Sequence, residues 1–216
     1  MSRALVLGSS KGIGQAIAQS LSEIECEVVR TSRKDLDTSN LQSVKDFAYK
    51  QDAFDILVLN TGGPPSKNFF EYSEEELLQY HNQLFLSFCI LLKELKINSG
   101  GYIFLMSSHL IKEPNNENLL VSSAYRLAFW SVLKGLGRHY AKKNISCINI
   151  APGPIKTQRL ISLVDDMDKF EQSLPFQKAG DPEEIGRFIA SIVEKNIKYI
   201  HATTILFDGG LSQGVL

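Results

Sequence analysis

The stretch that decides the fold is Leu7-Gly8-Ser9-Ser10-Lys11-Gly12-Ile13-Gly14, which joins an apolar run at 4–7 to a helical pattern of apolar residues. A strand that turns through glycines into a helix aims several backbone N–H groups, and the positive end of the helix dipole, at one point. Gly8 permits the tight turn, Gly12 lets a phosphate approach the backbone, and Gly14 lets the helix pack closely on the strand. The stretch therefore predicts a pyrophosphate site at the start of the first helix.

The spacing of these glycines is G-x3-G-x-G, which differs from the G-x-G-x-x-G of many dinucleotide-binding proteins. A flexible turn gives a similar cluster of glycines, and this alternative has to be weighed. Because a strand pattern precedes the cluster and a helix pattern follows it directly, phosphate binding is the favoured interpretation.

The composition excludes several classes of function. The 216 residues are 44% hydrophobic and 22% charged, as in ordinary globular proteins, and the formal net charge is −1. This balance gives no general attraction to nucleic acid or to an anionic membrane, and the longest apolar stretch, 84–92, is too short to span a bilayer. Three scattered cysteines and the lack of a signal-peptide pattern favour a cytoplasmic protein, and no cysteine or histidine spacing suggests a metal site.

Apolar runs alternate with helical patterns along the whole chain, which implies right-handed βαβ crossovers and a parallel sheet covered on both faces. Strands are expected at 4–7, 27–31, 55–60, 101–107, 145–150 and 203–207, and helices at about 12–24, 40–51, 73–97, 119–142 and 181–195. We therefore expect a single α/β domain over 1–216, with a doubly wound Rossmann-type sheet and ligands beyond the carboxyl ends of its strands.

One connection in this pattern is unusually short. The second strand ends near Ser32 and the next helix begins near Asn40, whereas a parallel crossover normally needs a dozen or more residues. We interpret this as a shortened second crossover with a third strand of a few residues at 35–37. The expected sheet then has about seven strands.

Four further motifs follow the glycine stretch in order. They are Leu59-Asn60-Thr61-Gly62, a strand ending in Ser107-Ser108, the segment Ala151-Pro152-Gly153-Pro154-Ile155-Lys156-Thr157, and the terminal Asp208-Gly209-Gly210. Together they resemble the short-chain dehydrogenase/reductase family over nearly the whole chain. The resemblance implies a nicotinamide cofactor and hydride transfer between a carbonyl and an alcohol carbon. It places Asn60 beside the adenosine, Asp37 at the adenine, and Ile155 and Thr157 at the nicotinamide amide.

The choice between NAD and NADP depends on the residues that follow the second strand. NAD-binding proteins place an acid at the ribose 2′-hydroxyl, whereas NADP-binding proteins place a cation there for the extra phosphate. Arg33 and Lys34 occupy this point, and Lys11 lies in the glycine stretch. Solvated surface charge is the alternative interpretation, and the neighbouring Asp35 weakens the argument. We expect NADP(H) to be preferred over NAD(H).

Fourteen residues in all are expected at the cofactor. They are Gly8, Ser10, Lys11, Gly12, Ile13, Gly14, Arg33, Asp37, Asn60, Gly62, Pro152, Gly153, Ile155 and Thr157.

The catalytic pattern departs from the family. Family members use a tyrosine and, four residues later, a lysine that lowers the pKa of the phenol. Here Ser122 and Arg126 align with those two positions, and Phe129 lies four residues after Tyr125. The same pair occurs in a divergent subgroup that is usually labelled 3-oxoacyl-(acyl-carrier-protein) reductase-like. Ser108 is expected to polarise the substrate oxygen.

The source of the proton is less defined. Arg126 cannot release a proton at neutral pH, and an alkyl hydroxyl such as Ser122 is a poor acid. Tyr125 is the best proton donor on the helix, although packing between helices is the favoured role for this side chain, and a structural or solvated role is favoured for His109. The family's catalytic asparagine aligns near Leu84, beside Asn82 and Gln83.

These observations predict an NADP(H)-dependent oxidoreductase that interconverts a small carbonyl and an alcohol. The alternative is a catalytically impaired NADP(H)-binding protein that acts as a sensor or assembly partner. The segment 156–178 is expected to form a substrate lid. Its apolar residues are expected to pack on the body of the protein and its acids to face water. If these residues line the site, they favour an uncharged, partly apolar substrate over an anionic one. The resemblance also implies a homodimer or homotetramer built through the helices at 73–97 and 119–142.

Overall fold

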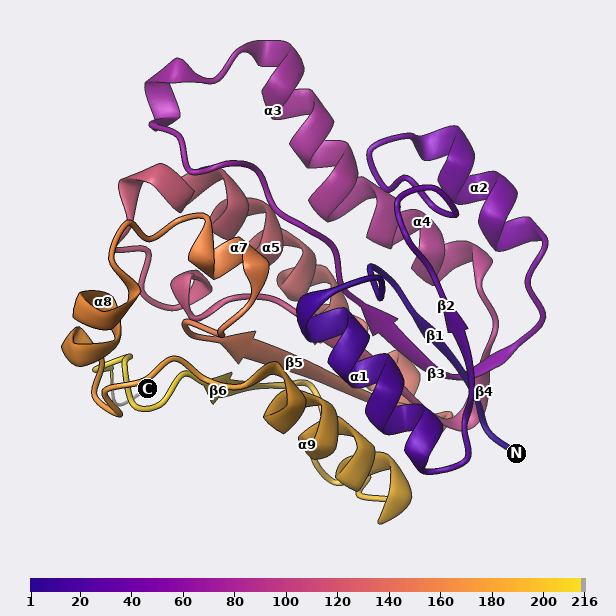
Figure 1. The fold of residues 1–216 in the computed structure, drawn as a ribbon. Helices are drawn as coiled ribbons and strands as arrows, with labels where there is room; N and C mark the ends of the chain where they lie inside the picture. The colour runs from indigo at the N-terminus through magenta and orange to yellow at the C-terminus, as the bar shows by residue number, and fades with distance from the viewer. Residues whose placement is uncertain (215–216) are drawn as a thin grey trace.

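Six parallel strands form the central sheet, in the order β2-β1-β3-β4-β5-β6 (Figure 1). The coordinates are a computed structural model, which describes residues 1–214. The strands are β1 Arg3–Val6, β2 Glu27–Arg30, β3 Phe54–Leu59, β4 Ile97–Met106, β5 Ser146–Pro152 and β6 Thr203–Phe207. Every residue of β5 is buried, as expected for the inner strand of a sheet with both faces covered. The expected doubly wound Rossmann-type architecture is confirmed.

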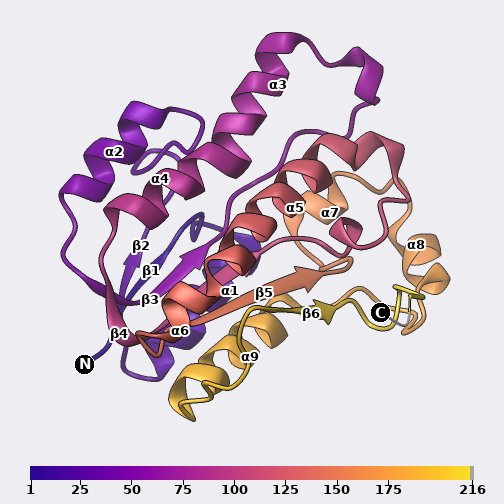
Figure 2. The ribbon, with the colours of Figure 1, turned by 180° about the vertical axis from the view of Figure 1, so that it is seen from behind.

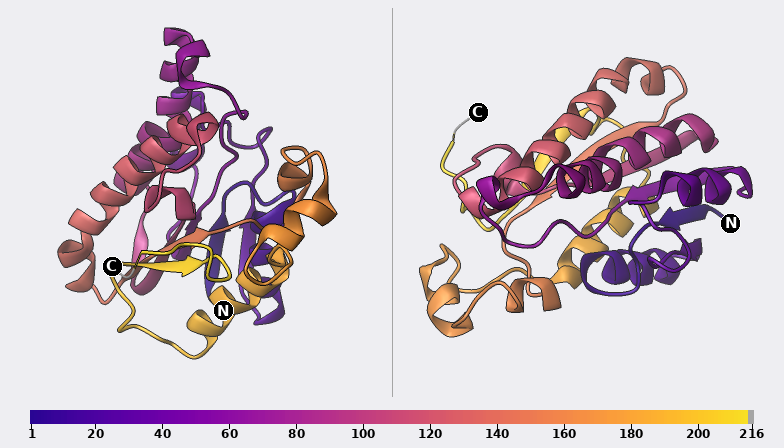
Figure 3. Two further views of the ribbon diagram at one scale, coloured as in Figure 1. Left: turned by 90° about the vertical axis from the view of Figure 1, so that its left-hand side faces the viewer. Right: turned by 90° about the horizontal axis from the view of Figure 1, so that it is seen from above.

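Helices cover both faces of the sheet (Figures 1, 2 and 3). One face carries α1 (Gly12–Glu23) and α9 (Pro182–Glu194), whose apolar sides pack on β1, β3, β4 and β5. The other face carries α2 (Leu41–Tyr49), α4 (Ser87–Glu94), α5 (Leu120–Gly135) and α6 (Gly137–Ala141).

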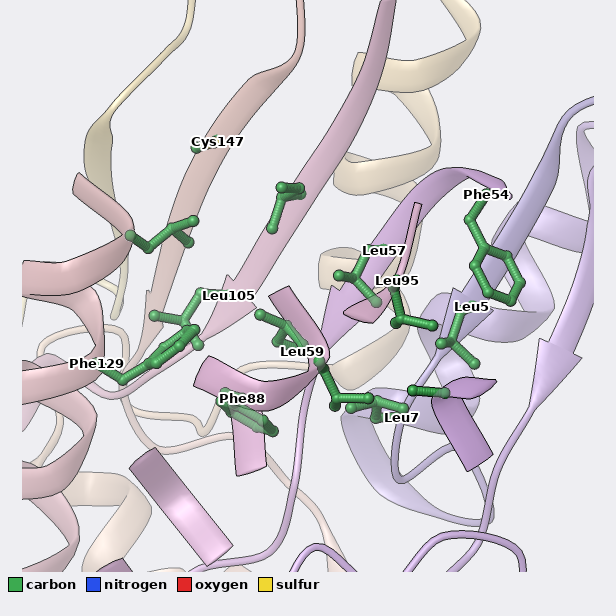
Figure 4. Packing of buried hydrophobic residues seen from close by; sticks show 14 of the residues in the cluster. Leu5, Leu7, Phe54, Leu57, Leu59, Phe88, Leu95, Leu105, Phe129 and Cys147 are labelled. Atoms are coloured by element: carbon green, nitrogen blue, oxygen red, sulfur yellow. The ribbon is translucent and has the colours of Figure 1, made fainter. Parts of the chain in front are cut away.

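The strands feed both layers because successive side chains point to opposite faces. In β1, Leu5 packs with the α2–α4–α5 layer, whereas Ala4 and Val6 pack with α1 and α9. Figure 4 shows the first of these clusters, in which Phe88 of α4 and Phe129 of α5 lie over the strands, with ring centroids 5.1 Å apart. These two apolar layers hold the sheet between the helices and fix the ends of its strands.

The predicted third strand at 35–37 is wrong, because a turn at 33–35 leads into irregular backbone there and β2 is the edge of the sheet. The N–H groups of Asp35 and Leu36 both donate to the carbonyl of Ser32, which closes the chain on itself. Leu36 is 4% exposed and packs in the core, so it anchors the loop without extending into a strand. The sheet accordingly has six strands.

Two predicted helices are interrupted. The helix expected at 73–97 runs through α3 (Glu74–His81), the π-helical turn η2 (Asn82–Leu86) and α4, and it ends before β4 begins at Ile97. The helix expected at 119–142 is divided into α5 and α6 at Leu136. A π turn inserts an extra residue and rotates the side chains that follow it, and such turns occur frequently at functional sites.

The remaining elements gather at the carboxyl ends of the strands. They are the short helices η1 Phe69–Glu71, η3 His109–Ile111, η4 Glu117–Leu119, α7 Gln158–Ile161 and α8 Met167–Ser173. In Figure 1 the arrows of β5 and β6 point toward α7 and α8, which project beyond the sheet. β1 and β3 are neighbours while the chain leaves β1 toward β2, so the sheet has its topological switch point between them.

Within residues 1–214, no helix is both long enough and apolar enough to cross a membrane.

Candidate functional site

A cavity of about 1110 Å³ lies at the carboxyl ends of the strands. It runs from the glycine loop after β1, past the ends of β3, β4 and β5, to the segment that carries α7 and α8. All fourteen residues expected at the cofactor line it: Gly8, Ser10, Lys11, Gly12, Ile13, Gly14, Arg33, Asp37, Asn60, Gly62, Pro152, Gly153, Ile155 and Thr157. The cavity is larger than the roughly 300–1,000 Å³ of most small-molecule pockets, so it has room for a dinucleotide and a second small molecule.

The glycine loop has the geometry that the sequence predicts. Gly8 and Gly12 have φ of +59° and +58°, a region that side chains other than glycine rarely adopt. A side chain at Gly14 would overlap the carbonyl oxygen of Gly8, so only glycine lets α1 lie this close to β1. The loop thereby brings the N-terminus of α1 to the cavity wall.

The N-terminus of α1 offers free backbone donors. Its first turn contains no acidic residue, and the N-cap residue Lys11 makes no side-chain capping hydrogen bond. The first N–H groups of a helix have no partner within the helix, and the helix dipole is positive at that end. An anion such as a pyrophosphate is the group that satisfies both features.

Asn60 connects the end of β3 to the loop. Its Nδ2 atom donates to the carbonyl oxygens of Leu7 and Gly8 at 3.1 and 3.3 Å. This side chain therefore holds the glycine turn in place as well as lining the cavity.

The basic residues after β2 lie at one end of the cavity. Arg33 and Lys34 both line it, whereas Asp35 does not. The carboxylate of Asp35 turns back on its own loop and accepts hydrogen bonds from the N–H and hydroxyl of Ser32. The acid that weakened the argument for NADP(H) is therefore directed away from the cavity.

Asp37 also lines the cavity but is engaged by neighbours. Its carboxylate lies 3.3 Å from Nε of Arg33, in an exposed ion pair, and accepts hydrogen bonds from the N–H and hydroxyl of Ser39. Burial raises the pKa of Asp37, but these Ser39 hydrogen bonds and Arg33 outweigh it, so the pKa lies below the ordinary value. Asp37 is a carboxylate that orients Arg33 at the cavity edge.

Ser122 and Arg126 lie one turn apart on α5, and both face the cavity. The Arg126 guanidinium donates from Nε to Ser122 Oγ (3.3 Å), from Nη1 to Met106 O (2.8 Å) and from Nη2 to Thr61 O (3.0 Å). Burial, with a smaller effect of the nearby Arg159, lowers the pKa of Arg126 to about 10. The side chain remains a cation at neutral pH and joins α5 to the ends of β3 and β4.

Ser108 follows β4 and completes the group of hydroxyls on the cavity wall. Its Oγ atom accepts a hydrogen bond from the N–H of Leu110 at 3.3 Å, which leaves the hydroxyl proton free to donate. The adjacent His109 also lines the cavity, and its Nδ1 lies 3.2 Å from the carbonyl oxygen of Pro152. Since a carbonyl can only accept, the proton belongs on Nδ1 and the ring is held by the β5 end.

Tyr125 is not brought to this site. Its side chain does not line the cavity; the hydroxyl donates to the carbonyl of Leu77 at 3.2 Å, and the ring packs edge-on against His81. Tyr125 therefore packs α5 against α3, which is the role that the sequence favoured for it.

The segment 156–178 contributes an apolar wall and a cation. The side chains that face the cavity include Leu160, Leu163, Val164, Phe170 and Arg159. The acids of this segment, Asp165, Asp166 and Asp168, do not line the cavity, in agreement with the expectation that they face water.

The lining residues that sequence reasoning did not assign to the site include Arg159, Gln83 and Tyr80. Arg159 donates to the carbonyl oxygens of Gly63 and Pro64, and burial lowers its pKa below the ordinary value. Gln83 donates to Gly62 O at 2.7 Å from the π turn, and Tyr80 lies on the last turn of α3. No local pattern in the sequence indicates that Arg159 or Tyr80 lies at the cavity. Gln83 was one of three residues near the position of the family's asparagine, and only the π turn shows that it is the one that reaches Gly62.

A nicotinamide dinucleotide fits these residues. The glycines leave a space that a Cβ would fill, the uncapped end of α1 supplies N–H donors for the pyrophosphate, and Arg33 with Lys34 supplies cations at the far end. Arg126 supplies further hydrogen-bond donors near the carboxyl ends of β3 and β4.

Comparison with known proteins gives the same picture. A family model described as Enoyl-(Acyl carrier protein) reductase matches residues 36–212. The chain is 28% identical over 219 residues to a 3-oxoacyl-(acyl-carrier-protein) reductase, FabG, of Chlamydia pneumoniae, covering 96% of this chain and 86% of the relative. It is 24% identical over 258 residues to the NADPH-dependent reductase BacG of Bacillus subtilis, covering 98% of each chain.

Solved structures have the same fold. A short chain dehydrogenase from Burkholderia cenocepacia J2315 in complex with NADP superposes with a TM-score of 0.84 at 18% identity, covering 97% of each chain. A short-chain dehydrogenase/reductase from Serratia marcescens gives a TM-score of 0.87 at 21% identity, covering 98% of each chain. With the family model spanning most of the sequence, the chain belongs to the short-chain dehydrogenase/reductase family of NAD(P)-dependent oxidoreductases.

Proposed function

We propose that this protein is an NADP(H)-dependent reductase that interconverts a small carbonyl compound and its alcohol. The observation that carries the proposal is that a glycine-loop cofactor site and the Ser122–Arg126 pair line one continuous cavity. The named relatives are reductases, which supports catalysis over a purely binding role.

The reduced nicotinamide, when bound, supplies the hydride that adds to the carbonyl carbon. Ser122 and Ser108 each accept a hydrogen bond from a fixed N–H group, so each hydroxyl proton is free to point at the carbonyl oxygen. These two donors orient the carbonyl and stabilise the negative charge that develops on its oxygen.

Arg126 adds a fixed positive charge beside Ser122 and offers its remaining N–H groups to the ribose hydroxyls. It does not donate the proton, because its pKa of about 10 leaves it charged at neutral pH. The proton that completes the alcohol reaches the oxygen from water through the Ser122 hydroxyl. Carbonyl, hydride and proton together give the alcohol.

The preference for NADP(H) is proposed from the same cavity. Arg33 and Lys34 are the only charged residues lining it between β2 and Asp37, and Asp35 faces away. A guanidinium fork binds a phosphate in a bidentate manner, whereas it gains little from a ribose hydroxyl. The NADPH-dependent relative and the NADP-bound neighbour support this choice.

We further propose that the protein acts in the cytoplasm as a homodimer or homotetramer that forms through α4 and α5. Leu127 of α5 is 46% exposed, an apolar side chain for such an interface. Light scattering coupled to size-exclusion chromatography measures the assembly.

The function is tested by titrating NADPH with nucleotide fluorescence and then following NADPH oxidation over a broad panel of carbonyl compounds. Wild-type protein should bind NADPH and turn over at least one carbonyl. Ser122→Ala and Arg126→Met should each lower kcat/KM at least about tenfold, as expected when a charge-assisted donor is lost. Binding without turnover on any carbonyl contradicts the proposal and leaves the catalytically impaired alternative.

A further inference from the structure

Three polar side chains converge on one point of the cavity wall, beside Gly63. If Gly63 carried a Cβ atom, that atom would lie 2.9 Å from Ser122 Oγ, 3.3 Å from Arg159 Nη2 and 3.6 Å from Arg126 Nη2. The absence of a side chain at Gly63 therefore leaves two guanidinium groups beside the hydroxyl that orients the carbonyl. The second of these cations, Arg159, therefore lies close to the Ser122 hydroxyl.

Neither guanidinium has a carboxylate partner within residues 1–214. Their hydrogen bonds go to Ser122 Oγ and to the neutral carbonyl oxygens of Met106, Thr61, Gly63 and Pro64. No ion pair of the described chain includes Arg126 or Arg159. Partly buried charges are normally paired, so this pair of cations is suited to an anion from outside the chain.

The lining of the cavity as a whole also has more positive than negative side chains. Five lysine and arginine side chains line it, and Asp37, paired with Arg33 at the opposite end, is the only carboxylate among the lining residues that the structure describes. Burial lowers the pKa of both Arg126 and Arg159, as expected for cations held together without a counter-ion.

The phosphates of the cofactor do not account for Arg159. The pyrophosphate site is the N-terminus of α1, and the cations for a ribose phosphate are Arg33 and Lys34, after β2. Arg159 instead contacts the Gly63-Pro64 turn, where the cavity continues to the apolar side chains of Leu160, Leu163 and Phe170. Its guanidinium faces the part of the cavity left for the substrate.

The geometry points to an oxo acid as the substrate: a carbonyl compound whose carboxylate binds Arg159, one or a few bonds from the carbonyl held by Ser122. This assignment rests on the proposed reductase function and narrows its substrate class. Arg159 has the planar fork that binds a carboxylate in a bidentate manner, and the apolar wall accommodates the hydrocarbon part.

The test compares matched substrates. NADPH oxidation is measured with 2-, 3- and 4-oxo acids and with their methyl esters, which keep the carbonyl and remove the charge. Binding of the same pairs to NADP-saturated protein is measured by calorimetry, which needs no turnover. The variants are Arg159→Ala and Arg159→Gln, with Arg138→Ala as the control, because Arg138 is an exposed residue of α6 that does not line the cavity.

We expect at least one oxo acid to exceed its ester about tenfold or more in kcat/KM and in affinity, as for a charged hydrogen bond. Arg159→Ala and Arg159→Gln should reduce that ratio to near one without changing the affinity for NADPH, and Arg138→Ala should preserve it. Equal use of acid and ester by the wild-type protein overturns the inference and leaves the reductase function intact. A loss of NADPH affinity in the Arg159 variants also overturns it, since Arg159 then serves the cofactor.

A failure of the reductase function is distinguished from a failure of this inference. If no carbonyl is reduced, the calorimetric comparison still decides: an oxo acid that binds more tightly than its ester through Arg159 supports the anion site, and equal binding overturns it. The wild-type comparison of acid and ester requires no variant to fold.

Discussion

At the residue scale, the choice of arginine at position 126 changes what the site can do. A lysine ammonium is a point charge, whereas the Arg126 guanidinium donates in three fixed directions, to Ser122, Met106 and Thr61. The side chain therefore fixes the Ser122 hydroxyl and ties α5 to the ends of two strands with one cation. The cost of holding that cation away from water is visible in its lowered pKa of about 10.

Tyr125 gives a prediction at this scale. Because its hydroxyl donates to Leu77 O and it does not line the cavity, Tyr125→Phe should leave kcat/KM unchanged. The variant should lose about 1 kcal/mol of unfolding free energy, the usual contribution of one hydrogen bond, measured by urea denaturation. A tenfold fall in turnover would instead make Tyr125 the proton donor.

At the element scale, close packing between helices positions the cofactor end of the molecule. α1 and α9 approach so closely that a side chain at Gly186 would lie 2.6 Å from both Ala16 O and Ser20 Oγ. On the opposite face, the π turn η2 brings Gln83 to Gly62 O and leaves Leu84 buried in the core. Gly186 thus determines how closely α9 packs on α1, and Gln83 joins the π turn to the loop that follows β3.

The N-cap of α9 gives a prediction at the element scale. Asp181 accepts a hydrogen bond from Glu183 N at 3.1 Å, and replacing it with alanine should cost about 1 kcal/mol of unfolding free energy. Asp181→Asn should keep most of the unfolding free energy that the cap contributes, because the amide oxygen can accept the same hydrogen bond. Thermal or urea unfolding of both variants measures the difference.

The pH dependence of this cap follows from the direction of its pKa shift. Hydrogen bonds from the Glu183 side chain and backbone N–H hold the pKa of Asp181 below its ordinary value. A lowered pKa in the folded state means that the contribution is complete above the ordinary pKa, about 3.9, and is lost as the pH falls through the lower folded value. The difference between wild type and Asp181→Ala should therefore be constant near neutral pH and shrink in strong acid.

At the scale of the whole molecule, the cavity joins loops from almost every strand, so a ligand there should stabilise the entire fold. NADPH at a concentration 100 times its Kd should add about 2.7 kcal/mol, equivalent to roughly 5–10 °C in Tm for a domain of this size. Thermal unfolding at several NADPH concentrations measures the effect. Arg33→Ala should reduce the shift with NADPH and leave any shift with NADH unchanged; equal losses with both would contradict the NADP(H) assignment.

The sequence by itself determined the layered α/β architecture and the position of the glycine loop. Apolar runs, helical periodicity and glycine spacing act over a few neighbouring residues, so they can be interpreted without knowing the rest of the fold. The fourteen expected cofactor residues line one cavity because parallel strands bring their carboxyl ends to one edge. The expectation of a strand at 35–37 was wrong. The sequence shows a buried apolar residue, Leu36, as a strand would have, but it does not show that the N–H of Leu36 donates to Ser32 O and closes a turn.

Only the tertiary structure decided which side chains enter the cavity from distant parts of the chain. Arg159 enters through the carbonyls of Gly63 and Pro64, which lie 96 and 95 residues earlier. Tyr125 leaves the site through a contact with Leu77, 48 residues earlier. Such contacts depend on how helices and loops pack across the whole fold, and no local pattern contains that information. Packing therefore decides which side chains line the proposed substrate part of the cavity, whereas the local sequence decides the glycine loop of the proposed cofactor part.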